Sequence, residues 1–343
     1  MRASPSLDGL VSHPAYSQPP SRAAAIPDVT VEDLRQVEER LRAELTSREP
    51  RLEEIALHLV GAGGKRIRPL VVSLGFHAAA GGIGRERRDD AVEVAVALEL
   101  IHSATLLHDD IIDASDVRRG RPSAVRAFGL ADTLVAGDFL FCRAFALCAR
   151  FETHVIRWAA DACVALTEGE MLQARFRRNP AVTLTDYLEI VERKTAVLFA
   201  TGARTAAHLA GAPPERIERL ASAGRHLGMA FQMQDDLLDV DGAAASTGKP
   251  QGLDLRDGNP SLPIVLGLEA DPKLRTLFAV ADPTSADVED GLARLRACGV
   301  LDAVRRHVAA ELDAGLADLR TLPASDASAA LLDLGRALGS RAG

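Results

Sequence analysis

The stretch from Ile101 to Gly120, IHSATLLHDDIIDASDVRRG, carries three aspartates in the pattern D-D-x-x-D. The same pattern returns far downstream in FQMQDDLLD, residues 231–239. The six aspartates are Asp109, Asp110, Asp113, Asp235, Asp236 and Asp239. Because a helix turns by about 100° per residue, the carboxylates of each block share roughly one helix face. Two such faces opposite each other would form a dense group of carboxylate oxygens.

The surroundings of the two blocks favour a metal site over an ordinary solvated helix face. Apolar residues precede both blocks, in SATLLH and in GMAFQMQ, and also lie within them. Adjacent like charges on a largely buried helix repel each other, so they need a compensating cation. Oxygen ligands suit hard divalent ions, and Mg²⁺ usually completes its shell with water and phosphate. The pattern therefore points to a diphosphate substrate.

Apolar residues at three- and four-residue spacing run through most of the chain, which indicates helices. The chain has 343 residues, of which 47% are hydrophobic and 4% aromatic, with no convincing alternating strand. We expect helices at about 69–80, 89–113, 131–151, 154–176, 185–210, 214–240 and 262–268, and shorter ones within 286–337. The prediction is one all-α domain over residues 28–343. Residues 1–27, rich in Ser, Pro and Ala, are expected to form a disordered extension.

Composition argues against several classes of protein. The net charge of −8 with no dominant basic stripe disfavours a nucleic-acid-binding protein. The four cysteines form no CxxC pair, as in reduced thiols of a cytosolic protein. No uninterrupted apolar stretch is long enough for a membrane span, and the N-terminus lacks a signal-peptide core. A cytoplasmic enzyme without a membrane span is therefore expected.

Cationic and polar residues suited to an anionic substrate accompany the acidic blocks. Arg118 and Arg119 follow the first block closely enough to fold back beside it, and guanidinium groups match phosphate oxygens. The glycine-rich loop GAGGKRIRP (residues 61–69) places Lys65 and Arg68 near a helix start, with Pro69 at a plausible first helical position. The remaining polar candidates are Lys194, Thr195, Gln232 and Lys249. Taken alone, His102 on its apolar helix is expected to be an ordinary core histidine.

With these segments and GKPQGLDLRDGNPSLP (residues 248–263), the chain resembles the trans-polyprenyl diphosphate synthases over residues 31–336. The resemblance implies the isoprenoid synthase fold, in which antiparallel helices surround a central cavity, and a homodimer. It also implies head-to-tail (1′-4) condensation of isopentenyl diphosphate with an allylic diphosphate, farnesyl or geranylgeranyl.

The resemblance further implies a role for each site residue. Asp109, Asp113 and Asp235 would bind Mg²⁺, expected as three ions, with Asp110, Asp236 and Asp239 supporting them. The allylic diphosphate would be held by Arg118, Lys194 and Lys249. Isopentenyl diphosphate would be held by Lys65, Arg68, His102 and Arg119, which replaces the core interpretation of His102. Thr195 and Gln232 would flank the reacting carbons.

One departure from the family pattern lies at Asn259. The family usually has a lysine there, so one cationic contact to the diphosphate is missing in this chain. A charge-assisted hydrogen bond contributes about 1.5–3 kcal/mol, so activity could be weaker without being abolished.

Product length is expected to depend on the helix that leads into the first block. Short-chain relatives place a bulky aromatic residue one turn before the motif, where this chain has Ala104 and Thr105, with Ile101 deeper. An open tunnel and a product of about C30 or longer are therefore expected. Phe139, Phe141 and Phe145 are candidates for a deeper floor, although core packing is the simpler explanation. The alternatives are a geranylgeranyl diphosphate synthase, a class I terpene cyclase and a non-catalytic subunit of a heteromeric synthase.

Overall fold

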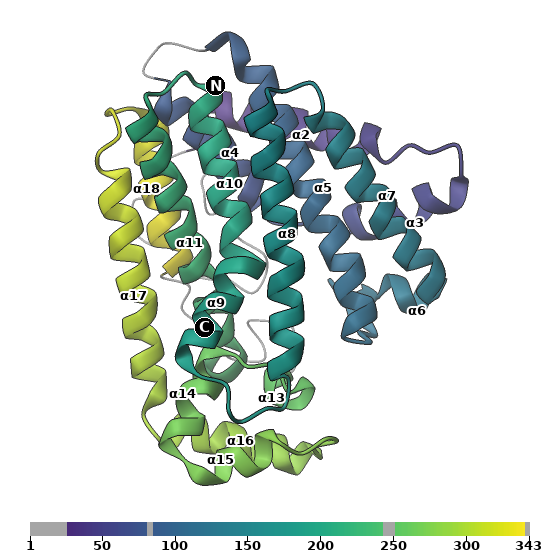
Figure 1. Ribbon diagram of the computed structural model, residues 1–343, viewed down its shortest axis with the longest axis vertical. Coiled ribbons are helices and arrows are strands. Elements are labelled where there is room, and N and C mark those ends of the chain that lie inside the picture. Colours follow the sequence, from purple (N-terminus) through teal and green to yellow (C-terminus); the bar gives the residue numbers. More distant parts are fainter. Residues whose placement is uncertain (1–25, 81–84, 243–250, 340–343) are drawn as a thin grey trace.

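The computed structural model describes residues 26–80, 85–242 and 251–339 of the chain. These residues are almost wholly helical, which confirms the predicted all-α class (Figure 1). The first helices are α2 (Asp28–Glu44), α3 (Pro50–Val60), α4 (Ile67–Ala79), α5 (Arg88–Ile112), α6 (Ala124–Phe128), α7 (Leu130–Cys148) and α8 (Thr153–Phe176). They continue as α9 (Leu184–Val191), α10 (Val197–Leu209), α11 (Pro214–Asp241), α13 (Leu253–Asp257) and α14 (Leu262–Ala270). The last are α15 (Pro272–Phe278), α16 (Ser285–Ala297), α17 (Val300–Leu319) and α18 (Asp326–Gly339).

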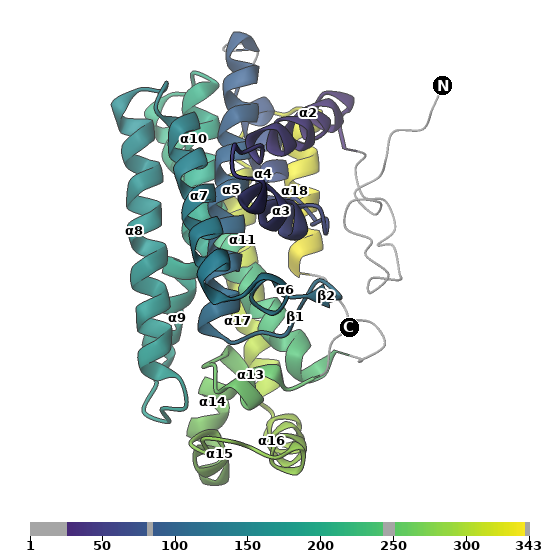
Figure 2. The same cartoon turned by 90° about the vertical axis from the view of Figure 1, so that its right-hand side faces the viewer.

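The long helices run roughly along the longest axis of the molecule. Helices α7, α8, α10, α11 and α17 extend along this direction, and α13 to α16 gather at one end (Figure 1). Helices α2 and α3 cover one side of the bundle, and α3 is the nearer of the two to the small hairpin that follows α5 (Figure 2). Its strands are β1 (Val117–Arg118) and β2 (Arg121–Pro122), paired antiparallel. The C-terminal end of α5 and the hairpin that follows it therefore lie towards the same end of the bundle as α13, which follows α11 (Figure 2).

Helix α5 is the central helix of the apolar core, although its length and composition would allow it to cross a membrane. Of its most apolar window, 72% is buried inside the protein. Its neighbours are α2, α4, α7 and α10. A helix that is apolar on all sides is commonly buried among other helices in the core of a protein.

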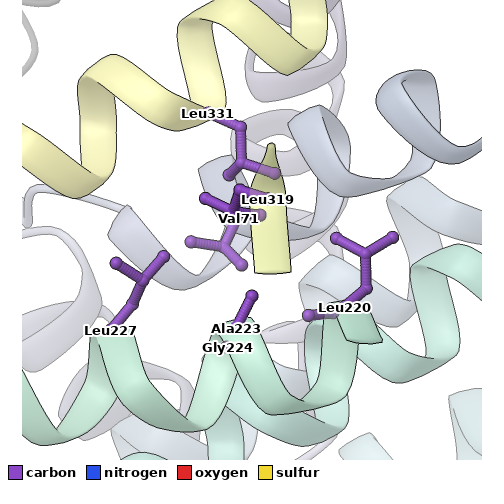
Figure 3. A pocket seen from close by; sticks show the side chains of 8 residues that line it. Val71, Leu220, Ala223, Gly224, Leu227, Leu319 and Leu331 are labelled. Carbon is purple, nitrogen blue, oxygen red and sulfur yellow. The ribbon is translucent and has the colours of Figure 1, made fainter. Parts of the chain in front are cut away.

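A second apolar seam joins α4, α11, α17 and α18. In Figure 3 the side chains of Val71, Leu220, Leu227, Leu319 and Leu331 converge on a small pocket from these four helices. All of its lining residues are apolar or glycine. It offers no group for an anionic substrate, so we interpret it as a packing gap.

The described structure departs from the predicted elements in small ways. Ile26 is buried in the core, although the prediction placed it in the extension; residues 1–25 lie outside the described residues. Pro69 is the third residue of α4, not the first. The helix expected over 185–210 is interrupted by a π-helical turn at Glu192–Ala196. Such turns are frequent at functional sites.

Candidate active site

The two acidic blocks occupy the C-terminal parts of α5 and α11, and the π turn lies between them. Lys194 in this turn places its Nζ atom 3.9 Å from Oδ1 of Asp109. The next residue, Thr195, donates a hydrogen bond of 2.9 Å from Oγ1 to Oε1 of Gln232 on α11. The π turn therefore presents one side chain to each block and links residues that the sequence separates widely.

Close packing of α11 against the π turn makes this link possible. At Gly228 an added Cβ would lie 2.6 Å from the Cα atom of Ala196. Gly228 is one helical turn before Gln232, on the same face of α11. The absence of a side chain at Gly228 thus lets Gln232 approach Thr195.

In the first block, the protein fixes Asp110 and leaves the other two aspartates half-buried. Arg118 donates from Nε (2.8 Å) and pairs through Nη2 (2.7 Å) with Oδ1 of the fully buried Asp110. The other oxygen of this carboxylate, Oδ2, is buried without a hydrogen-bond partner in the described part of the chain. Asp113 forms an ion pair with Arg177. The expectation that Arg118 folds back beside the first block is confirmed.

In the second block, Asp236 and Asp239 are also fixed by the protein. Asp236 is buried and accepts hydrogen bonds from the hydroxyl of Tyr187 (2.7 Å), from Nε2 of Gln232 (2.9 Å) and from the N–H of Leu262 (3.0 Å). Asp239 accepts from the N–H groups of residues 253 and 254, both at 3.1 Å, at the start of α13. Asp235 is half-buried. Asp110, Asp236 and Asp239 are thus held by the hydrogen bonds described above, while Asp109, Asp113 and Asp235 are half-buried.

Burial raises the pKa of a carboxyl group in or beside each block. The pKa of Asp109 is raised to about 6, mainly by burial; Lys194 opposes this shift, and Glu170 and Asp113 add to it. Burial also raises the pKa of Asp254 well above its ordinary value, and Asp239 adds to this effect. The sequence reasoning missed Glu170, Asp254 and Arg177. Their contacts depend on tertiary packing, and nothing in their local sequence marks them.

The donor set fits Mg²⁺ held partly by substrate oxygens. Within residues 26–80, 85–242 and 251–339, no three acidic, histidine or cysteine side chains are close enough to enclose a metal ion by themselves. The carboxylates are nevertheless crowded, and Oδ2 of Asp110 lacks a partner in the described structure. Mg²⁺ is typically bound through one or two carboxylates together with phosphate and water. The residues therefore fit an ion that arrives with a diphosphate.

A basic group lies beside the acidic one. Half-buried Arg68 stacks on the ring of Phe199 at 5.0 Å, and desolvation lowers its pKa to about 10. Burial, followed by the charges of Arg68 and Arg119, holds the pKa of His102 well below its ordinary value. A Cβ on Gly64 would lie 3.2 Å from the Arg119 guanidinium, so the glycine leaves room for it. The structure therefore brings Arg68, His102 and Arg119 together.

Of the remaining residues singled out in the sequence, Lys65 and Asn259 lie in the described part of the chain and Lys249 does not. Lys65 is half-buried in the loop before α4. Lys249 lies outside the described residues. Asn259, where the family usually has lysine, accepts a hydrogen bond of 3.2 Å from Nε2 of Gln173 on α8.

The candidate chain-length residues lie on α5, and two of them belong to the apolar core. Thr105 is half-buried, and its hydroxyl donates to the backbone oxygen of His102 at 2.7 Å. Ala104 and Ile101 are buried. Phe145 is exposed, which argues against a place on the floor of an internal tunnel.

Comparisons with known proteins agree with these motifs. The Polyprenyl synthetase family model matches residues 49–294. The chain is 35% identical over 315 residues to octaprenyl diphosphate synthase of Escherichia coli (strain K12), covering 90% of this chain and 96% of that protein. It is 37% identical over 305 residues to nonaprenyl diphosphate synthase of Mycobacterium tuberculosis, covering 87% and 90%.

A solved structure gives the same result. The fold matches polyprenyl synthase from Caulobacter crescentus, crystallised with calcium and isoprenyl diphosphate, with a TM-score of 0.86 at 33% identity. The match covers 100% of both chains. The predicted family, isoprenoid synthase fold and enzyme class are confirmed: the chain belongs to the polyprenyl synthetase family and is a prenyltransferase.

Proposed function

We propose that this chain condenses isopentenyl diphosphate head-to-tail with an allylic diphosphate, in a Mg²⁺-dependent reaction, to build a long-chain all-trans polyprenyl diphosphate. The observation that carries the proposal is the arrangement of two acidic helix ends around Lys194, Thr195 and Gln232, beside a separate basic group. An acidic site suits a metal-bound diphosphate, and a basic site suits a second diphosphate bound without metal. Two diphosphate sites side by side are what a condensation of two diphosphates requires.

We assign the allylic diphosphate to the acidic group. Asp109, Asp113 and Asp235 would hold Mg²⁺, which supplies a Lewis acid for the leaving diphosphate. The anchored aspartates, Asp110, Asp236 and Asp239, would keep these helix ends in place. Lys194 would donate to the diphosphate oxygens, together with Arg118 and Lys249. Lys194 suits this role because Asp109 and Glu170 raise its pKa, although burial opposes them.

We assign isopentenyl diphosphate to the basic group of Lys65, Arg68, His102 and Arg119. The buried Nε atom of Arg68 has no hydrogen-bond partner in the described structure, so it can donate to a bound anion. The low pKa of His102 keeps its ring neutral before the diphosphate binds, and a neutral ring still offers one N–H donor.

The chemistry then follows from position and electrostatics. The allylic C–O bond breaks and its electron pair leaves with the diphosphate. The double bond of isopentenyl diphosphate attacks the resulting carbocation, and the departing diphosphate accepts the proton that is lost. The hydrogen bond between Thr195 and Gln232 holds two partly negative oxygens in fixed positions, where they can stabilise the cation.

The long product is supported by small side chains on α5 and by the named relatives. Ala104 and Thr105 are smaller than the aromatic residue that would block the growing chain at these positions. The octaprenyl and nonaprenyl diphosphate synthases among the relatives favour this product over geranylgeranyl diphosphate.

A second copy of the chain is the proposed partner. Helix α7 exposes Leu134, Val135 and Phe145, and α8 exposes Val164 and Met171. Neighbouring large apolar side chains exposed on packed helices are typical of a protein interface. We therefore propose a cytoplasmic homodimer formed through α7 and α8. Light scattering after size exclusion should give twice the monomer mass, and V164E/M171E should give the monomer mass.

The proposed chemistry is tested by incorporation of labelled isopentenyl diphosphate into an acid-labile product with farnesyl diphosphate as primer. We expect incorporation with Mg²⁺ and none with excess chelator or in the D235N variant. Equal incorporation with and without divalent metal would contradict the assignment of the acidic group.

A further inference from the structure

Arg177 is a cation of the acidic site that the family pattern did not indicate. It directly follows the last residue of α8, and its Nη2 atom pairs with Oδ1 of Asp113. Its Nε atom is buried and has no hydrogen-bond partner among the described residues. Arg177 therefore contacts Asp113, a proposed metal ligand, while the Nε donor of its guanidinium group has no partner among the described residues.

The same end of α8 also contacts the loop that follows the second acidic block. Gln173, one turn before Arg177, donates to Oδ1 of Asn259. The backbone N–H of Arg178 donates to the carbonyl oxygen of Gly258 at 2.9 Å. Arg177 thus lies between the first block and the position where the family lysine is absent.

The next residue, Arg178, makes a different kind of contact. The Arg178 side chain donates to the backbone oxygens of Val280 and Arg256, so it anchors the chain turn. Arg177 instead contacts a carboxylate, and a guanidinium can exchange a carboxylate for phosphate oxygens because both accept its forked donors.

We propose that Arg177 binds the allylic diphosphate and supplies the cationic contact that Asn259 does not provide. Before ligands arrive, Arg177 neutralises Asp113. When Mg²⁺ occupies that carboxylate, the two cations repel each other, and the guanidinium turns to the diphosphate oxygens. This inference rests on the proposed function, since it requires a metal-bound diphosphate at the acidic site.

The test measures binding, with farnesyl thiodiphosphate as a probe that resists ionisation. Calorimetry with Mg²⁺ would compare the wild type with R177Q, R177K, R177Q/N259K and R175Q. Arg175 is the matched control because it is exposed on the same helix end and forms no ion pair with any residue that the structure describes. We expect the Kd to rise about tenfold or more in R177Q, the change that loss of one charge-assisted hydrogen bond produces. R175Q should be unchanged, and N259K should restore most of the affinity lost in R177Q.

A second readout separates substrate binding from a merely structural role. Titration with Mn²⁺ alone, followed by electron paramagnetic resonance, should show equal or tighter binding in R177Q because a competitor for Asp113 is removed. Weaker Mn²⁺ binding in R177Q, or an unchanged Kd for the probe, would overturn the inference. If R177Q does not fold, R177K replaces it in the comparison with the wild type. Lysine keeps the positive charge, so the Kd of R177K for the probe should rise by less than the roughly tenfold increase expected when the contact is lost.

The inference and the proposed function fail in different ways. A wild-type protein that does not bind the probe with Mg²⁺ contradicts both. If the wild type and R177Q bind the probe equally tightly, only the role of Arg177 is contradicted.

Discussion

Replacing Asp109 with asparagine should stabilise the metal-free protein although it removes a proposed metal ligand. The Asp109 side chain is only 18% exposed. Burial, followed by the neighbouring Glu170 and Asp113, raises its pKa from 3.8 to about 6, even with Lys194 nearby. Asparagine has nearly the same shape and no charge, so it avoids the cost of ionisation in this site.

The size of the effect follows from the shift in pKa. A difference of about two pKa units corresponds to about 3 kcal/mol at about 1.36 kcal/mol per unit. Between pH 4 and 6 the folded protein binds this proton more tightly than the unfolded chain. Asp109 therefore makes the metal-free wild type lose stability as pH rises through this range. Above about pH 6 the full penalty remains, and D109N should be more stable there by up to about 3 kcal/mol.

The assay is denaturant unfolding in chelator at pH 5 and pH 8, with D313N as a control. Asp313 is an exposed residue of α17 and forms no ion pair within the described part of the chain. We expect D109N to exceed the wild type at pH 8 and to approach it at pH 5. Mg²⁺ with diphosphate should stabilise the wild type and not D109N. A D109N protein that is less stable than the wild type at pH 8, with D313N unchanged, would refute the electrostatic reasoning.

Three further substitutions test other parts of the site. T105F should block the path along α5 and shorten the product, seen by chromatography of dephosphorylated products, while T105S should leave it unchanged; unchanged length in T105F contradicts the tunnel assignment. Y187F removes a buried hydrogen bond to Asp236 and should lower unfolding free energy by about 1.5–3 kcal/mol, so equal stability would show that this bond is not needed. G228A should cost about 1–3 kcal/mol and reduce turnover, because its Cβ would meet the Cα of Ala196 at 2.6 Å. In G315A the nearest atom would be 3.2 Å away and belongs to a side chain, so a smaller loss is expected; equal losses would remove the special role of Gly228.

Much of the fold could be predicted because its helices carry apolar residues at helical spacing. Helix α5 was expected at 89–113 and is found at Arg88–Ile112, and α11 was expected at 214–240 and is found at Pro214–Asp241. The π turn at Glu192–Ala196 could not be predicted, since its residues fit an ordinary helix and only packing of the turn against α8 and α11 distinguishes it.

The site could be predicted where a motif concentrates charge, and not where tertiary contacts add it. The two D-D-x-x-D blocks are visible in the sequence, but the hydrogen bonds that anchor Asp236 come from Tyr187 and Leu262, which lie far from it along the chain. Arg177 resembles any arginine at the end of a helix until its contact with Asp113 is seen. Spatial neighbours from separate helices leave no mark in the local pattern.

The most direct test of the account is the size of the product. Purified protein would be incubated with Mg²⁺, labelled isopentenyl diphosphate and farnesyl diphosphate, and the dephosphorylated products separated by chromatography. The account predicts a ladder that ends in long all-trans polyprenols. A ladder that stops at the twenty-carbon alcohol would contradict the open path beside Ala104 and Thr105, and a cyclic hydrocarbon would contradict the condensation itself.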